Sequence, residues 1–248
     1  MIREMTVKRM SKAITWKDWI FPIILIAAGV VWAVYDLMNP TDSMVAAYLT
    51  KERLMVALGQ HLYLILVSAS LAIVTAFPLG VLLTRPLFRH FSGLILGIVN
   101  VLQSIPSFAV IGIVFSFAGV GARTAIIALW VYSLLPILNN TIAGIQGVDR
   151  SVIDSARGMG MTKAAILFKI EIPLASNVIF AGIRTAMVIN IGTAVIATFI
   201  GAGGLGDFII SGQNTSRHMV MLLGAGLASI IAMVSDSLLG MVEKKFTP

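Results

Sequence analysis

The chain reads Asp154-Ser155-Ala156-Arg157-Gly158-Met159-Gly160 in its second half, and ten residues later it reads Ile170-Glu171-Ile172-Pro173. This stretch is polar and basic, whereas long apolar runs lie before and after it. Charged groups are costly to place in the hydrocarbon interior of a bilayer. The stretch therefore predicts a water-exposed loop between membrane-spanning segments.

The composition places the whole chain among membrane proteins. Of its 248 residues, 58% are hydrophobic and 12% are charged, whereas soluble domains carry about 25% charged residues. The sequence has no cysteine, which excludes disulfides, thiolate metal sites and a thiol nucleophile. We expect an all-α integral membrane protein, because each span must satisfy its backbone hydrogen bonds internally.

Six apolar runs are long enough to cross a hydrocarbon core of about 30 Å, which needs roughly 20 helical residues. Pro106 and Pro136 lie inside the third and fourth runs, where a missing N–H and a bulky ring favour a kink. The expected spans are Trp19–Leu37, Leu62–Leu83, Gly93–Gly119, Ala122–Leu138, Leu174–Ile200 and His218–Val242.

Lysine and arginine residues predict the orientation of these spans. With the amino terminus in the cytoplasm, 13 of the 18 basic residues fall on the cytoplasmic side, four fall outside, and Arg184 lies within a span. Because positive residues accumulate on the cytoplasmic side, both termini and the Asp154 loop are expected there. Topology thus accounts for the net charge of +7, and a nucleic-acid partner is not needed to explain it.

The loop itself has the pattern of two short helices. Ser151 can cap the first, whose apolar residues recur at helical spacing until Gly160 ends it. Thr162 can cap a second helix, Lys163–Ile170, which Pro173 is expected to end. From composition alone, an amphipathic helix lying on anionic lipid remains an open alternative.

A resemblance to a known family favours a different role for this loop. It is similar to the Glu-Ala-Ala…Gly…Ile-x-Leu-Pro signature of permease subunits of ATP-binding-cassette importers, with Asp for the usual Glu, Ser for the first Ala and Ile for the usual Leu. The matching positions are Asp154, Ala156, Gly160, Ile170 and Pro173. In that family the loop is a coupling helix, seated in a groove of a cytoplasmic ATPase that binds ATP and Mg.

The resemblance spans about Leu58 to Gly240 and implies the type-1 importer permease fold. We expect residues 58–240 to form the importer-type transmembrane domain, with residues 150–173 as its coupling loop. Residues 1–57 would supply a basic cytoplasmic N-terminus, the first transmembrane helix and an outer linker, and residues 241–248 a cytoplasmic tail. Such permeases are multi-pass proteins of the bacterial cytoplasmic membrane and work in pairs, with a second copy or a similar permease.

A finer resemblance indicates the substrate. Several segments are similar to the osmoprotectant branch of the family, which imports glycine betaine, carnitine, choline or proline betaine. These segments are Gln60–Leu62, Gln103–Ser107, Ala181–Thr185, Ile189–Ala194 and Phe199–Asp207. A methionine or sulfonate importer on the same scaffold remains an alternative.

Two further partners are expected from what the sequence lacks. Aromatic cages favour quaternary ammonium groups, but the aromatic residues here are sparse and scattered. Substrate recognition is therefore expected on a separate extracytoplasmic binding protein. The sequence contains no Gly-x-x-x-x-Gly-Lys-Ser/Thr run for ATP. We thus expect no enzymatic activity and no cofactor in this chain, with ATP hydrolysis on the partner ATPase.

Polar residues inside spans are the candidates for a solute path or gate. Arg184 and Asp236 lie at similar depths from the cytoplasmic side, so they are expected either to pair or face a common cytoplasmic vestibule, or to reach water separately. The glycines at 201–206, including Gly203, predict a tight turn with positive φ, or else an outer gate or docking surface. The other candidates, for which interhelical hydrogen bonds are an equal explanation, are Gln103, Ser104, Asn139, Asn140 and Asn190.

Other classes of function fit the sequence less well. None of the three histidines has metal-ligand spacing, and no hydrolase motif is present. A secondary transporter driven by an ion gradient is the main rival, but such folds usually show two repeated halves, which we do not find here. The expected mechanism is alternating access, in which ATP binding by the partner moves the coupling loops and opens the path outward.

Overall fold

The computed structural model describes residues 14–246, and these form helices joined by short loops, with no strand among them. The predicted basic N-terminus, with Arg3, Lys8, Arg9 and Lys12, lies outside the described residues. The elements are α1 (Trp16–Met38), α2 (Ser43–Tyr48), α3 (Lys51–Leu83), η1 (Arg89–Phe91), α4 (Ser92–Ser104), α5 (Ser107–Ala118), α6 (Ala122–Gln146), α7 (Arg150–Gly158), α8 (Lys163–Ile166), η2 (Leu167–Glu171), α9 (Ile172–Ala194), η3 (Val195–Ile200), α10 (Gly206–Asn214) and α11 (His218–Phe246).

Five helical segments of the described chain are long and apolar enough to cross a membrane: α1, α3, α6, the run Lys163–Ile200 and α11. The third predicted span, Gly93–Gly119, is not one kinked helix. It is the pair α4 and α5, which are bent by 100°. The break falls at Pro106, whose ring disfavours helical geometry for the preceding residue, and Ile105 is extended, with φ −75° and ψ 131°. Counted as one broken span, the pair brings the described chain from five spans to six.

The break between α4 and α5 leaves a backbone carbonyl without a helical partner. The Tyr132 hydroxyl, from α6, donates to the carbonyl of Ile105. Non-helical backbone at membrane depth is tolerated where protein groups satisfy it. The break is therefore held by α6, and it puts Gln103 and Ser104 at the end of α4.

Other predicted boundaries also change. α3 begins at Lys51, well before the predicted Leu62, because Thr50 caps it by accepting the N–H of Arg53. The predicted end at Pro173 is wrong, since the helix continues from α8 through a π-helical turn, η2, into α9. The N–H of Ile172 bonds to the carbonyl of Leu167, five residues back, so the wider turn accommodates the missing N–H of Pro173.

α3, α6 and α9 form the centre of the molecule. Gly182 of α9 lies so close to α6 that an added Cβ would stand 2.5 Å from Asn140 Cβ and 2.6 Å from the carbonyl oxygen of Pro136. Small residues permit this approach between membrane helices. The side chain of Asn190 joins the three helices, donating to Ser68 Oγ and Ser133 Oγ at 2.9 Å each.

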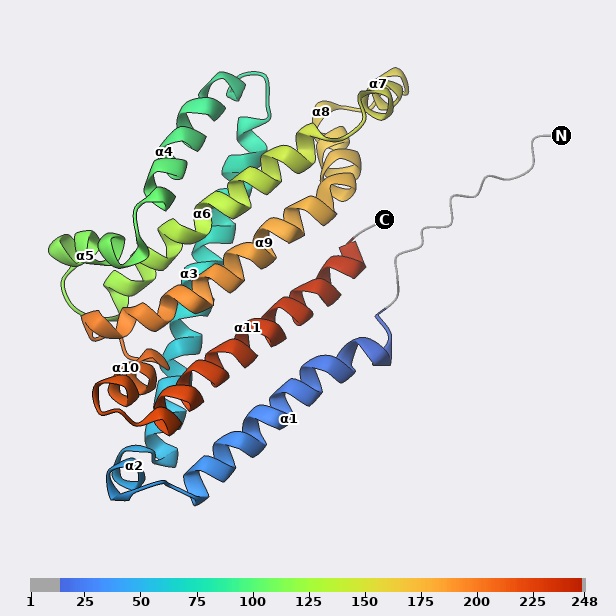
Figure 1. Ribbon diagram of the computed structural model, residues 1–248. Coiled ribbons are helices and arrows are strands. Elements are labelled where there is room, and N and C mark those ends of the chain that lie inside the picture. The colour runs from blue at the N-terminus through green and yellow to red at the C-terminus, as the bar shows by residue number, and fades with distance from the viewer. Residues whose placement is uncertain (1–13, 247–248) are drawn as a thin grey trace.

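The bundle has two distinct ends (Figure 1). α7 and α8 lie at one end, together with the first turn of α1 and the last turn of α11, which an ion pair between Lys244 and Asp18 joins. α2, α10 and the loop before α10 lie at the opposite end. The described residues thus begin and end on the same side as the predicted coupling loop. That this side is cytoplasmic stays a prediction.

Candidate functional site

The first helix of the predicted coupling loop, α7, is closed at both ends by side-chain and backbone bonds. Asp149 is its N-cap, in place of the predicted Ser151, because the Asp149 carboxylate accepts the N–H of Ser151 at 2.8 Å. This bond holds the pKa of Asp149 below its ordinary value. At the other end, the N–H of Gly160 bonds to Arg157 O at 2.9 Å and that of Met161 to Ala156 O at 3.1 Å.

These two bonds form a Schellman motif, which needs a residue with positive φ just after the helix. Gly160 supplies it, with φ +81°. An added Cβ at Gly160 would meet nothing within 4 Å. The requirement for glycine here is therefore conformational, and the surface around it is open.

The motif residues of α7 divide between the inside and the outside of the loop. Ala156 is fully buried, so a larger side chain would separate α7 from the segment that follows. Asp154 and Arg157 form an ion pair at 3.1 Å whose side chains are 67% and 66% exposed. α7 therefore presents a charged, rigidly capped surface to the solvent.

The later motif residues lie where the loop joins α9. Ile170 belongs to η2, and Pro173 lies in the first turn of α9. Pro173 lines an apolar pocket of about 390 Å³ together with Phe77 of α3 and Phe246 of α11. The motif thus runs from the exposed helix α7 to the place where α3, α9 and α11 meet.

Arg184 and Asp236 form the ion pair that was one of the two expectations. Arg184 Nε lies 2.7 Å from Asp236 Oδ1, Nη2 lies 2.7 Å from Oδ2, and Nη1 lies 3.0 Å from Glu243 Oε2. Two hollows of about 390 and 410 Å³ are both lined by Arg184 and Asp236. The Arg184 guanidinium therefore links α9 to α11, and it lines both hollows.

Removing either partner of this pair should destabilise the protein. We expect Arg184→Gln and Asp236→Asn each to lower the free energy of unfolding by about 1–2 kcal/mol, and the double variant to cost no more than the worse single one. Denaturation of the purified protein in detergent measures this. Additive losses would mean that the two groups act separately. Glu243→Gln should have a smaller effect, because Arg184 keeps its two bonds to Asp236.

The glycine run forms a tight turn, as expected, with φ +68° at Gly201, +73° at Gly203 and +101° at Gly204. The N–H of Gly204 donates to Gln60 Oε1 of α3 at 3.0 Å. An added Cβ at Gly203 would overlap that same oxygen. We call residues 201–206 the glycine loop; Gln60 holds it against α3.

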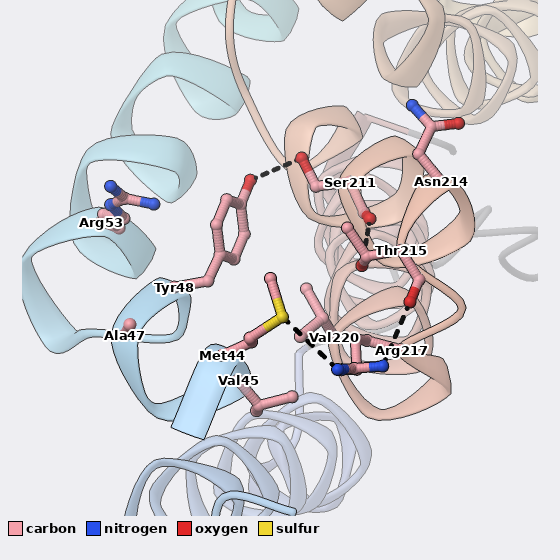
Figure 2. Close-up of a pocket in the computed structure, with 10 residues that line it drawn as sticks. All are labelled: Met44, Val45, Ala47, Tyr48, Arg53, Ser211, Asn214, Thr215, Arg217 and Val220. Carbon is pink, nitrogen blue, oxygen red and sulfur yellow. Dashed lines mark hydrogen bonds between the residues drawn. The ribbon is translucent and has the colours of Figure 1, made fainter. Parts of the chain in front are cut away.

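A pocket of about 440 Å³ lies beside this end of the bundle, between α2, the start of α3, α10 and the start of α11 (Figure 2). Its one aromatic ring is Tyr48, whose hydroxyl bonds to Ser211 Oγ at 2.9 Å. The Arg53 guanidinium lies 4.9 Å from the centre of that ring, and Arg217 also lines the pocket. Arg217 Nε is paired with Asp42 Oδ2 at 2.7 Å, and the Arg53 guanidinium already lies over the Tyr48 ring, so this ring is a poor site for a quaternary ammonium ion.

Comparison with known proteins assigns the family. The model for "Binding-protein-dependent transport system inner membrane component" matches residues 76–248. The chain belongs to this family. The permease is 46% identical over 198 residues to the carnitine transport permease protein OpuCB of Listeria monocytogenes, covering 79% of this chain and 89% of that protein. It is 44% identical over 189 residues to the choline transport system permease protein OpuBB of Bacillus subtilis, covering 76% and 86%.

A solved structure shares the fold of the permease. A chain of the MetNI methionine ABC transporter, in an inward-facing conformation, matches with a TM-score of 0.69 and 23% identity. The match covers 80% of this chain and 98% of that one. The type-1 importer permease fold is thereby confirmed, and the multi-pass membrane location follows from the family and the spans.

Hydrogen bonds already engage four of the five predicted polar path residues of the permease. Gln103 Nε2 donates to Tyr132 O at 3.4 Å, Ser104 Oγ to Asn100 O at 2.8 Å, and Asn140 Nδ2 to Pro136 O at 2.8 Å. Asn139 is exposed and Asn190 is buried among three helices. Their part in a solute path stays a prediction, and the observed bonds already account for the geometry of four of the five.

Sequence reasoning missed three contacting residues. Gln60 falls within a segment that resembles the osmoprotectant branch, and Arg85 is one of the 13 basic residues expected on the cytoplasmic side. Glu171 was noted only as part of the loop. Arg85 Nη2 lies 2.5 Å from Glu171 Oε2. These pairs join residues 86 and 144 positions apart, so no local pattern could identify them.

Proposed function

We propose that this chain is the membrane-spanning permease subunit of an ATP-driven importer for a compatible solute such as glycine betaine, carnitine or choline. The observation that carries the proposal is the identity of 38–46% with permeases named for these solutes and for osmoprotectant import, over most of both chains. The match to a methionine transporter is lower, at 23% identity, and supports the fold only. An amino acid or sulfonate as the solute is the alternative.

The geometry supports a particular arrangement of partners. α7 is exposed, charged and capped, as a helix that docks on a cytoplasmic ATPase must be, and that ATPase would bind the ATP and Mg. Asp154, Ala156, Gly160, Ile170 and Pro173 would form the coupling surface. The opposite end, with α2, α10 and the glycine loop, would face a substrate-binding protein. A second copy or a similar permease would complete the path.

Alternating access follows from this arrangement. Closure of two ATPases against the α7 helices would tilt the packed spans, and a liganded binding protein would favour the outward-open state. A ligand shifts such an equilibrium only through its different affinities for the two states. Gly203 would then belong to an outer gate, and the Arg184–Asp236 pair would lie beside the path near the inner end.

Uptake by whole cells tests the proposal. Cells that lack this chain should lose uptake of labelled glycine betaine, choline or carnitine after a salt upshift, and restoring the chain with its partner subunits should recover it. A control strain would carry the chain with a partner ATPase that cannot hydrolyse ATP. Uptake of none of the three solutes, but of methionine or a sulfonate, would keep the importer assignment and overturn the solute assignment.

A further inference from the structure

An ion pair links the base of the coupling loop to the end of a different span. Glu171 is the last residue of η2, and its side chain is only 10% exposed. Its oxygen Oε2 lies 2.5 Å from Nη2 of Arg85, which follows α3. Thr84 Oγ1 accepts from Arg85 Nε at 3.1 Å and from Nη2 at 2.8 Å. The guanidinium is thus fixed in place at the C-terminal end of α3.

The ion pair lies where the helix geometry changes. The turn Leu167–Glu171 is π-helical, between the short helix α8 and the span α9. Single π-turns often occur at functional sites. Movement of α7 and α8 relative to α9 would be concentrated in this wider turn, and Glu171 would carry that movement to Arg85.

α3 extends from this ion pair to the other end of the bundle. Between Gln60 and its last residue, Leu83, it covers roughly 35 Å, at 1.5 Å per residue. Gln60 holds the glycine loop by accepting the N–H of Gly204 at 3.0 Å. One helix is therefore bonded to the coupling loop at one end and to the glycine loop at the other.

We propose that the Glu171–Arg85 ion pair is the joint through which the coupling loop moves α3, and that α3 carries this movement to the glycine loop. Glu171 and Arg85 are positioning residues in this proposal, since they act through α3 and not on a solute or nucleotide. A mostly buried pair suits such a joint, because separating its members leaves a charge without a partner. The inference rests on the proposed importer function, in which α7 receives the force of ATP binding.

The test uses the complete importer in proteoliposomes, with solute uptake and ATP hydrolysis measured together. Glu171→Gln should lower uptake about tenfold with the complex still assembled, while hydrolysis changes less than about twofold. The ATP hydrolysed per solute should therefore rise at least about fivefold. Arg85→Gln should do the same, and the double variant should be no worse than either single one.

Arg89→Gln is the matched control. Arg89 is a cation only four residues from Arg85, it is exposed, and no side-chain partner is seen for it among residues 14–246. Its variant should keep the wild-type ratio of ATP to solute. If uptake and hydrolysis fall in proportion in Glu171→Gln, the ratio of ATP hydrolysed to solute taken up is unchanged. That result would show a structural role only and would overturn the proposed joint.

A second readout needs no solute and separates this inference from the proposed function. The chain has no cysteine, and Gly59, beside Gln60, is exposed with open space around it. A fluorescent probe on Gly59→Cys should respond to ATP in the assembled complex and lose that response when Glu171→Gln is added. A response retained in Glu171→Gln would overturn the joint. A wild-type response without uptake would overturn the solute assignment alone.

Discussion

Replacing Gly160 with valine should reduce uptake to the background level while the chain still accumulates in the membrane. Gly160 has φ +81° and closes the Schellman motif of α7. An L-residue in this conformation costs about 1–2 kcal/mol, and a β-branched residue costs more. The valine variant should therefore release the end of α7 and turn its charged surface away from the proposed partner ATPase. Uptake of labelled glycine betaine, with immunodetection of the chain, measures this.

A substitution series separates backbone strain from contact with a partner. Asparagine tolerates the left-handed region, so Gly160→Asn should keep most of the uptake and Gly160→Ala an intermediate amount. Gly158→Ala is the matched control, because Gly158 is helical and also has open space around it. If asparagine and valine abolish uptake equally, a side chain at this position meets the ATPase directly, and the backbone explanation is wrong.

The spans could be predicted because membrane thickness sets a length that apolar runs must reach. At Pro106 the sequence predicts a kink, and the structure has a full break between α4 and α5, bent by 100°. Pro136 lies within an unbroken helix, α6, whereas Ile105 before Pro106 is extended. The difference is tertiary, because the hydroxyl of Tyr132 satisfies the carbonyl that the break exposes. A sequence shows where a helix can break, and the neighbouring helices decide whether it does.

The candidate site divides in the same way. The motif residues of α7 came from a family resemblance that a short, local pattern carries, and their role in coupling stays a prediction. The pairing of Arg184 with Asp236 was one of two expectations, because depth can be counted along each helix from the membrane surface. The pairs Glu171–Arg85 and Gln60–Gly204 depend on which helix ends meet, and that information is absent from any short stretch of the chain.

Gly203→Val should also abolish uptake. The cause of this loss can be tested by changing Gln60, the residue that Gly203 faces. A side chain at Gly203 would overlap Gln60 Oε1. Gln60 could turn away only by giving up the N–H of Gly204, which it accepts at 3.0 Å. The residue would also keep a φ of +73°, at a cost of about 1–2 kcal/mol. The glycine loop should detach from α3, with the complex still assembled.

The smaller variant Gly203→Ala distinguishes collision from strain. If collision with Gln60 dominates, as we expect, Gly203→Ala combined with Gln60→Ala should take up more solute than Gly203→Ala alone, although less than the wild type. Uptake through the complete importer and recovery of the assembled complex are measured for each variant. No gain in the double variant would assign the loss to backbone strain. Loss of the complex in Gly203→Val would show that the glycine loop is needed for assembly, and its assignment to an outer gate would be wrong.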